Sequence, residues 1–192
     1  MTITHAPSRT DEAAAMRDLI TIFSPQPDRL IKRRSISPLA SLEGVTLGLL
    51  CNSKPNAQVL LDAVAEAISE QVNLAGIVRA SKAIPSSAAP DEVYDTLAAQ
   101  CGAIVFASAD CGSCTSWGIH DTTQMERRGI PSLCLVAHPF VPMAQAQSLA
   151  LEYPDLRTTV FEGPIAGIAE ENVRAKGRAI AAEVIATLTG KV

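Results

Sequence analysis

From Gly44 onward, short apolar runs alternate with segments of helical period, and this alternation constrains the fold more than any other feature. Five apolar runs have the length of buried strands: residues 45–50, 74–79, 104–108, 132–137 and 158–161. Apolar residues with helical spacing follow each run, in residues 56–71, 91–100, 115–128, 142–151 and 170–188. Strands that alternate with helices favour parallel pairing with right-handed crossovers. The pattern therefore predicts an α/β fold, a doubly wound, flavodoxin-like sheet of five parallel strands.

The composition fits a single domain of ordinary size. Of the 192 residues, 47% are hydrophobic but only 4% are aromatic. Small aliphatic side chains are typical of parallel strands that helices cover on both faces. Residues 1–40 differ from the rest, because a helical pattern at residues 11–23 is followed by a stretch with several prolines. We therefore expect an N-terminal arm, residues 1–40, and one α/β domain, residues 41–192.

Charge and motif content argue against several classes of function. The net charge of −4 does not favour binding to nucleic acid. Neither an apolar run of about 18 residues nor a secretory signal is visible, so we expect a cytoplasmic protein without membrane contact. The glycine-rich nucleotide motifs and the Gly-x-Ser-x-Gly motif of hydrolases are absent from the sequence, and we expect no cofactor.

The motif that points to chemistry is Cys111-Gly112-Ser113-Cys114, between the predicted strand 104–108 and the predicted helix 115–128. Free N–H groups at a helix N-terminus stabilise a thiolate, so Cys111 is the candidate nucleophile. Cys114 is one turn away, near enough to close a disulfide, and is the candidate resolving thiol. In a reducing compartment such a pair is more typical of catalysis, redox chemistry or metal binding than of a structural bridge.

Loops at the carboxyl ends of the strands are expected to meet at one edge of the sheet, where doubly wound folds bind ligands. Polar side chains in these loops are candidate substrate ligands: Asn52, Lys54, Asn56, Ser113, Thr115, Ser116 and His138. Asp110 would by itself raise the pKa of the neighbouring Cys111 thiol, and Lys54 is the candidate cation that restores the balance. Lys54 and the two asparagine amides would also hold the negative end of an anionic substrate.

His120 is the candidate catalytic proton carrier, and Asp121 is able to orient a neighbouring imidazole ring. Nine residues separate His120 from Cys111, which is about two and a half helical turns. On a straight helix the two side chains point apart. His120 therefore works with Cys111 only if the helix begins later or bends at Gly118. The alternative is a histidine that is hydrogen-bonded within a helix–helix contact.

Three stretches resemble the motifs of a known family. They are Gly-Val-Thr-Leu-Gly-Leu-Leu-Cys-Asn-Ser-Lys-Pro-Asn-Ala at residues 44–57, Asp-Cys-Gly-Ser-Cys-Thr-Ser-Trp-Gly-Ile-His-Asp at residues 110–121, and Glu-Arg-Arg-Gly-Ile-Pro at residues 126–131. They resemble the UGSC-type family, named for its selenocysteine-Gly-Ser-Cys signature, over roughly residues 40–190. Cys111 occupies the position that selenocysteine holds in some members, which implies a nucleophilic or redox role.

The same region is similar to the selenoprotein subunit of glycine reductase component B, and this similarity implies reductive cleavage of a carbon–nitrogen bond. That subunit has a further cysteine where this chain has Trp117, and it depends on a pyruvoyl-bearing partner that this chain does not contain. In relatives the loop after the fifth strand commonly carries a His-Pro pair, whereas here it reads Glu162-Gly163-Pro164. These departures from the relatives predict a substrate other than theirs.

Our leading hypothesis is a cysteine-dependent oxidoreductase or lyase. Cys111 attacks a small, anionic substrate, Cys114 resolves the adduct, and an external thiol is the reductant. His120 or His138 would supply the proton. Two alternatives stay open: a non-catalytic binding or regulatory subunit of a heteromeric complex, and a metal site that uses Cys111, Cys114 and a histidine. We expect a homo-oligomer or a subunit of a hetero-complex.

Overall fold

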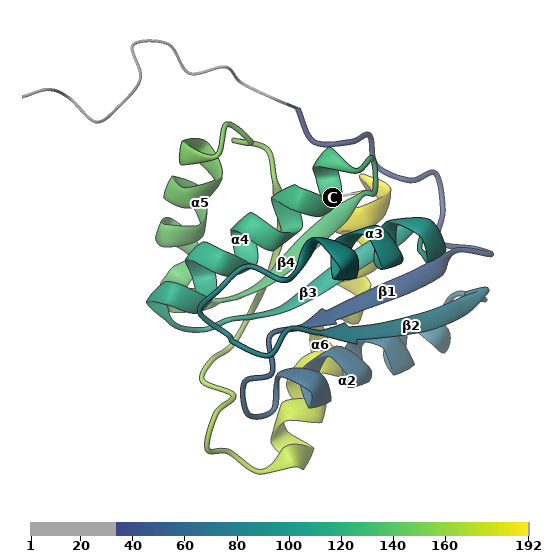
Figure 1. Ribbon diagram of the computed structural model, residues 1–192. Helices are drawn as coiled ribbons and strands as arrows, with labels where there is room; N and C mark the ends of the chain where they lie inside the picture. The colour runs from purple at the N-terminus through teal and green to yellow at the C-terminus, as the bar shows by residue number, and fades with distance from the viewer. Residues whose placement is uncertain (1–33, 192) are drawn as a thin grey trace, which may run out of the picture. The chain divides into compact units, whose positions relative to one another are not determined.

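A parallel sheet of five strands forms the centre of the computed structural model, which describes residues 34–191 (Figure 1). The strands lie in the order β2-β1-β3-β4-β5, and every neighbouring pair is parallel. Their bounds are β1 Thr46–Cys51, β2 Gly76–Ser81, β3 Ala103–Ala109, β4 Ser132–Ala137 and β5 Arg157–Phe161. This is the strand order of a flavodoxin-like doubly wound sheet, and the predicted fold class is confirmed.

Helices cover both faces of the sheet (Figure 1). Their bounds are α2 Ala57–Ser69, α3 Asp91–Gln100, α4 Gly112–Arg127, α5 Val141–Ala150 and α6 Glu170–Thr189, with a short 3₁₀ turn, η2 His138–Phe140, before α5. One buried cluster joins α2 and α6 to the sheet, and a second joins α3, α4 and α5 to its other face. Strand β3 serves both clusters, because Val105 belongs to the first and its neighbours Ile104 and Phe106 to the second.

Two element bounds differ from the sequence prediction in an informative way. Strand β2 begins at Gly76 rather than at residue 74, although Leu74 packs against the core from the preceding loop. Apolar pattern alone does not separate a buried loop residue from a strand residue. Helix α4 begins at Gly112, three residues before the predicted start, because the side chain of Cys111 caps it. The predicted helix at residues 11–23 lies outside the described residues.

The described end of the predicted arm packs on the sheet and its helices. The backbone N–H of Leu39 donates to the carbonyl of Leu188, 2.9 Å away, and that of Ile36 donates to the Glu126 carboxylate at 2.5 Å. The boundary between arm and domain at residue 40 stays a prediction. Among the described residues, no helix is long and apolar enough to cross a membrane.

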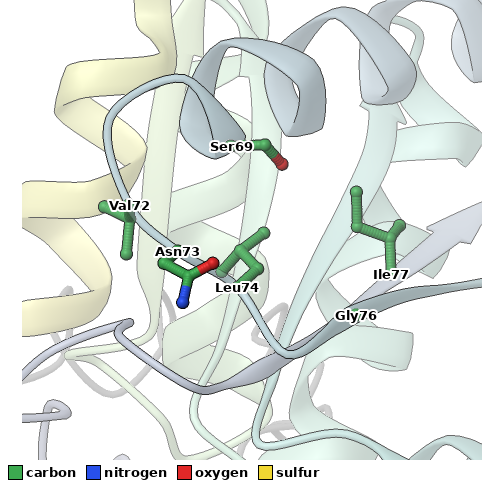
Figure 2. Close-up of a pocket in the computed structure, with 6 residues that line it drawn as sticks. All are labelled: Ser69, Val72, Asn73, Leu74, Gly76 and Ile77. Carbon is green, nitrogen blue, oxygen red and sulfur yellow. The ribbon is translucent and has the colours of Figure 1, made fainter.

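A shallow pocket lies between the end of α2 and the start of β2, at the amino end of the strands (Figure 2). Its lining residues are Ser69, Val72, Asn73, Leu74, Gly76 and Ile77. None of them is a charged residue or a cysteine. The pocket is therefore distinct from the carboxyl edge of the sheet, where Cys111 lies.

Candidate active site

Strands β1 and β3 are neighbours, so the loops that follow them meet at the carboxyl edge of the sheet. The meeting point is an ion pair: Lys54 Nζ lies 2.5 Å from Asp110 Oδ1. The Asp110 side chain is only 3% exposed and that of Lys54 is 19% exposed. The Ser108 hydroxyl also donates to Asp110 Oδ1, at 3.2 Å. The sequence analysis assigned Asp110 and Lys54 opposite effects on the pKa of Cys111, and the structure brings these two side chains together in one ion pair.

Two asparagines shape the loop after β1. Asn52 is fully buried, and its Nδ2 donates to the carbonyl of Ser108 at 2.8 Å. Asn56 has a positive φ of 66°, and its Nδ2 donates to the carbonyls of Ile165 and Ile168. Both amide groups therefore bind backbone of the protein itself and join the loop after β1 to neighbouring segments. Their direct contact with a substrate stays a prediction.

Cys111 is the residue that caps helix α4. Its Sγ accepts the backbone N–H of Cys114 at 3.2 Å and lies 3.6 Å from Ser113 Oγ. The Thr115 hydroxyl is buried and donates to the carbonyl of Cys111 at 2.6 Å, so it holds the backbone of the cap. Ser113 is exposed and Ser116 half-buried in the first two turns of α4. The backbone N–H of Cys114, one of the free N–H groups of the helix start, thus bonds to the sulfur of Cys111, and such groups favour an anion.

These contacts set the state of the Cys111 thiol. Partial burial works against the thiolate, but hydrogen bonds from Cys114 and Ser113, together with the positive charge of Lys54, lower the pKa of Cys111 below its ordinary value. Burial also opposes the charge of Lys54, but the ion pair with Asp110 outweighs it and raises the pKa of Lys54. The ammonium therefore remains charged at neutral pH and acts on the Cys111 sulfur by its positive charge.

Cys114 has the opposite character. Its side chain is buried, and burial together with the hydrogen bond to Cys111 raises the pKa of Cys114 to about 11. Both cysteines are free thiols in this structure. The motif therefore contains a half-exposed sulfur whose ionisation is favoured and a buried sulfur that keeps its proton at neutral pH, so Cys111 is the sulfur of the pair suited to attack first. Cys114 has to give up its proton before it can act as a resolving thiol.

Among the contacts of the described residues, neither candidate histidine bonds to Cys111 or to Cys114. His120 is on α4 and contacts its own helix: the Trp117 ring edge-on at 5.3 Å, Asp121 Oδ1 at 3.4 Å and Gln124 Nε2 at 3.3 Å. The helix begins earlier than predicted, so the later start that would bring His120 toward Cys111 is not observed. His138 is exposed in η2, directly after β4. The proton-transfer role of either histidine stays a prediction.

Met143 is a neighbour of the site that the sequence analysis missed. A Cβ atom built on Gly112 would lie 4.0 Å from both Sδ and Cε of Met143, which is 37% exposed. The first turn of α5 therefore borders the nucleophile with an apolar, polarisable side chain. The sequence predicts α5 as a helix but carries no signal that its first turn packs beside Gly112.

One group of potential metal ligands is present in the described part of the chain. Asp110, Cys111 and Cys114 place their ligand atoms within 4.8 Å of one another. The metal alternative predicted two cysteines and a histidine. In the group that the described residues form, the third member is the carboxylate of Asp110, and the participation of a histidine stays a prediction.

The comparisons with known proteins agree with the resemblance in the motifs. No curated protein matches the chain. The sequence model of the UGSC family matches residues 21–190, starting inside the predicted arm and including every site residue described above. The relation to the glycine reductase subunit stays a prediction. A match over most of the 192 residues shows that this chain belongs to the UGSC family.

Proposed function

We propose that the protein is a thiol-dependent enzyme that reduces or cleaves a small electrophilic substrate. One observation carries the proposal: the half-exposed Cys111 Sγ caps helix α4 and accepts the backbone N–H of Cys114 at 3.2 Å, while the side chain of Cys114 itself is buried. In agreement with this geometry, the pKa of Cys111 is lowered and that of Cys114 is raised. A structural pair of thiols has no need of this asymmetry.

The chemistry that we propose is a two-electron reduction. The Cys111 thiolate attacks the electrophilic atom of a substrate R–X, forming an S–R bond while X departs with the bonding electron pair. The Cys114 sulfur then attacks Cys111, forming the disulfide while R departs with its electron pair and a proton. The products are RH, HX and an oxidised Cys111–Cys114 pair, and an external thiol reduces that pair again.

The balance of electrons restricts the substrate. When R is a carbon group, the departing electron pair needs stabilisation, which an adjacent carbonyl or carboxylate provides. A carboxylate is also the group that Lys54 and the N–H groups of the α4 start would bind. The exposed hydroxyl of Ser113 and the exposed His138 complete the proposed binding surface. We therefore propose a small carboxylate or carbonyl compound with a leaving group beside that function.

Pulsed alkylation with iodoacetamide tests the proposal on the full-length protein. Reduced protein is treated from pH 5 to pH 9, with a chelator present, and each modified cysteine is mapped by mass spectrometry. We expect Cys111 to react first and to keep reacting below the pH at which an ordinary thiol with a pKa of about 8.5 stops. Mild oxidation should protect Cys111 and Cys114 together.

A Cys111→Ser variant is the matched control, because the hydroxyl keeps a polar cap on α4. It should fold normally, lose the fast alkylation and lose turnover of any electrophile that wild type consumes. A Cys111 that reacts no faster than an ordinary thiol would contradict the proposal, and so would full turnover by Cys111→Ser. We propose a cytoplasmic location, because the oxidised Cys111–Cys114 pair has to be reduced again by an external thiol and that reaction needs a reducing compartment.

A further inference from the structure

We propose that Asp110, Cys111 and Cys114 form a binding site for a thiophilic divalent cation such as Zn²⁺, and that the bound cation blocks the nucleophile reversibly. The binding site itself does not depend on the proposed reaction, whereas the blocking effect rests on the proposed role of Cys111 as the nucleophile. The site rests on the placement of three donor atoms at the carboxyl edge of the sheet, where the end of β3 and the start of α4 bring them together.

The three donors have the chemistry and the spacing that zinc requires. Two sulfurs and one carboxylate oxygen lie within 4.8 Å of one another. Zinc binds sulfur at about 2.3 Å and carboxylate oxygen at about 2.0–2.2 Å, so tetrahedral ligands lie roughly 3.5 Å apart. A contraction of about 1 Å, within the range of side-chain rotation, would therefore bring the three atoms into one coordination sphere. A fourth position stays open toward solvent, because Cys111 is only half-buried.

Asp110 is oriented for this role by its neighbours. Lys54 and the Ser108 hydroxyl both bond to Oδ1, and the second oxygen, Oδ2, is the atom that we assign to the metal. Metal-binding carboxylates are commonly held in this way by outer hydrogen bonds. The charge also balances: two thiolates and a carboxylate carry −3, and Lys54 with a divalent cation carries +3.

The consequence is a competition at one sulfur. A Cys111 thiolate that binds a metal has its electron pair engaged and does not attack an electrophile. Cys114 would be engaged at the same time, so the metal removes the nucleophile and the resolving thiol together. Free thiophilic cation should therefore inhibit the thiol chemistry, and a chelator should restore it.

Cadmium titration of the reduced, metal-free, full-length protein tests the site without reference to any substrate. Cd²⁺ gives a thiolate-to-metal charge-transfer absorption, and Zn²⁺ displaces it in a competition experiment. We expect one Cd²⁺ per chain. We expect affinity to fall at least a hundredfold in Cys111→Ser and in Cys114→Ser, and about tenfold or more in Asp110→Asn. Asp95→Asn is the control for loss of one negative charge, and Cys51→Ala the control for loss of one thiol.

The Asp110→Asn result separates this site from chelation by a simple pair of thiols. Equal affinity in wild type and in a folded Asp110→Asn variant would overturn the proposal, and so would a missing absorption in wild type. A second measurement needs no variant: Zn²⁺ at saturating concentration should slow alkylation of Cys111 at least tenfold, and unchanged alkylation would also overturn the proposal. Because thiol reactivity is measured with a chelator present, failure of the metal site leaves the proposed function standing.

Discussion

At Cys111 a single positive charge acts on the sulfur from a neighbouring loop. Lys54 lowers the pKa of Cys111 by its charge, and Asp110 fixes the ammonium of Lys54 in place. We expect Lys54→Gln to raise the pKa of Cys111, because the charge is lost while the carboxylate of Asp110 remains nearby. The profile of alkylation rate against pH should shift to higher pH.

Lys191→Gln is the matched control for the Lys54 prediction, since Lys191 is an exposed lysine near the C-terminus. It should leave the alkylation profile unchanged. An unchanged profile in Lys54→Gln would mean that the hydrogen bonds from Cys114 and Ser113 activate Cys111 without help from Lys54.

At the scale of the element, α4 holds its position through a close approach to the sheet. A Cβ atom on Gly118 would lie 2.6 Å from Cε1 of the buried Phe106, whereas one on Gly112 would meet its nearest neighbour, the side chain of Met143, only at 4.0 Å. We expect Gly118→Ala to lower the free energy of unfolding by about 1–3 kcal/mol, because the helix must move away from β3. Gly112→Ala should change it by less than about 1 kcal/mol. Urea denaturation of both variants checks the contrast, and equal effects would contradict it.

A buried ion pair joins α4 to the loop after β2. Lys82 Nζ lies 2.5 Å from Asp121 Oδ2, and the two side chains are 1% and 0% exposed. Tyr94 of α3 donates its hydroxyl to the other oxygen of Asp121. We expect Asp121→Asn to cost about 3–5 kcal/mol of unfolding free energy, because it leaves the ammonium of Lys82 buried without a counter-charge.

The double variant Lys82→Met with Asp121→Asn is the control for the buried pair. Removing both charges should recover at least half of the loss in the single variant, as measured by urea denaturation. If the double variant is as unstable as the sum of the two single variants, then packing rather than charge is the source of the loss.

At the scale of the whole molecule, one carboxylate ties three distant parts of the chain together. The buried Glu126 of α4 accepts N–H groups from Ile36 and from Ser132 and pairs with Arg157 of β5 at 2.8 Å. Arg157 also donates to the carbonyl of Ile36. Burial raises the pKa of Glu126 above its ordinary value although these bonds work in the opposite direction. Ionised Glu126 therefore depends on its partners.

We expect the stability loss in Arg157→Met to depend on pH. An acid with a raised pKa in the folded state costs stability once the pH exceeds its unfolded pKa, and removal of Arg157 raises the folded pKa further. The loss should be about 3 kcal/mol at pH 7 and clearly smaller at about pH 3, which lies below the ordinary pKa of a glutamate, so that Glu126 is protonated in both states. Urea denaturation at the two pH values measures it, and an equal loss at both would contradict the role of the charge.

Several features could be predicted from the sequence because they depend on neighbours along the chain. The alternation of apolar runs and helical segments is a local pattern, and it gave the parallel sheet and the bounds of α3 and β4 without change. The position of Cys111 at the start of a helix is local as well. The predicted start of α4 is three residues too late, and the cause is local as well. A cysteine side chain is an unusual helix cap, and the pattern gave no reason to expect one.

The strand-end rule placed Lys54 near Cys111 and Asp110 from the sequence, but only the tertiary structure decided which polar atoms bond to each other. Lys54 and Asp110 are 56 residues apart, and their pairing follows from the adjacency of β1 and β3 in the sheet. The same folding directs the amide groups of Asn52 and Asn56 into backbone carbonyls and places Met143 beside Gly112. The sequence thus determined the elements, the family and the reactive motif, because each is written in consecutive residues. The partners of that motif come from distant segments, and strand order and helix packing bring them together in space.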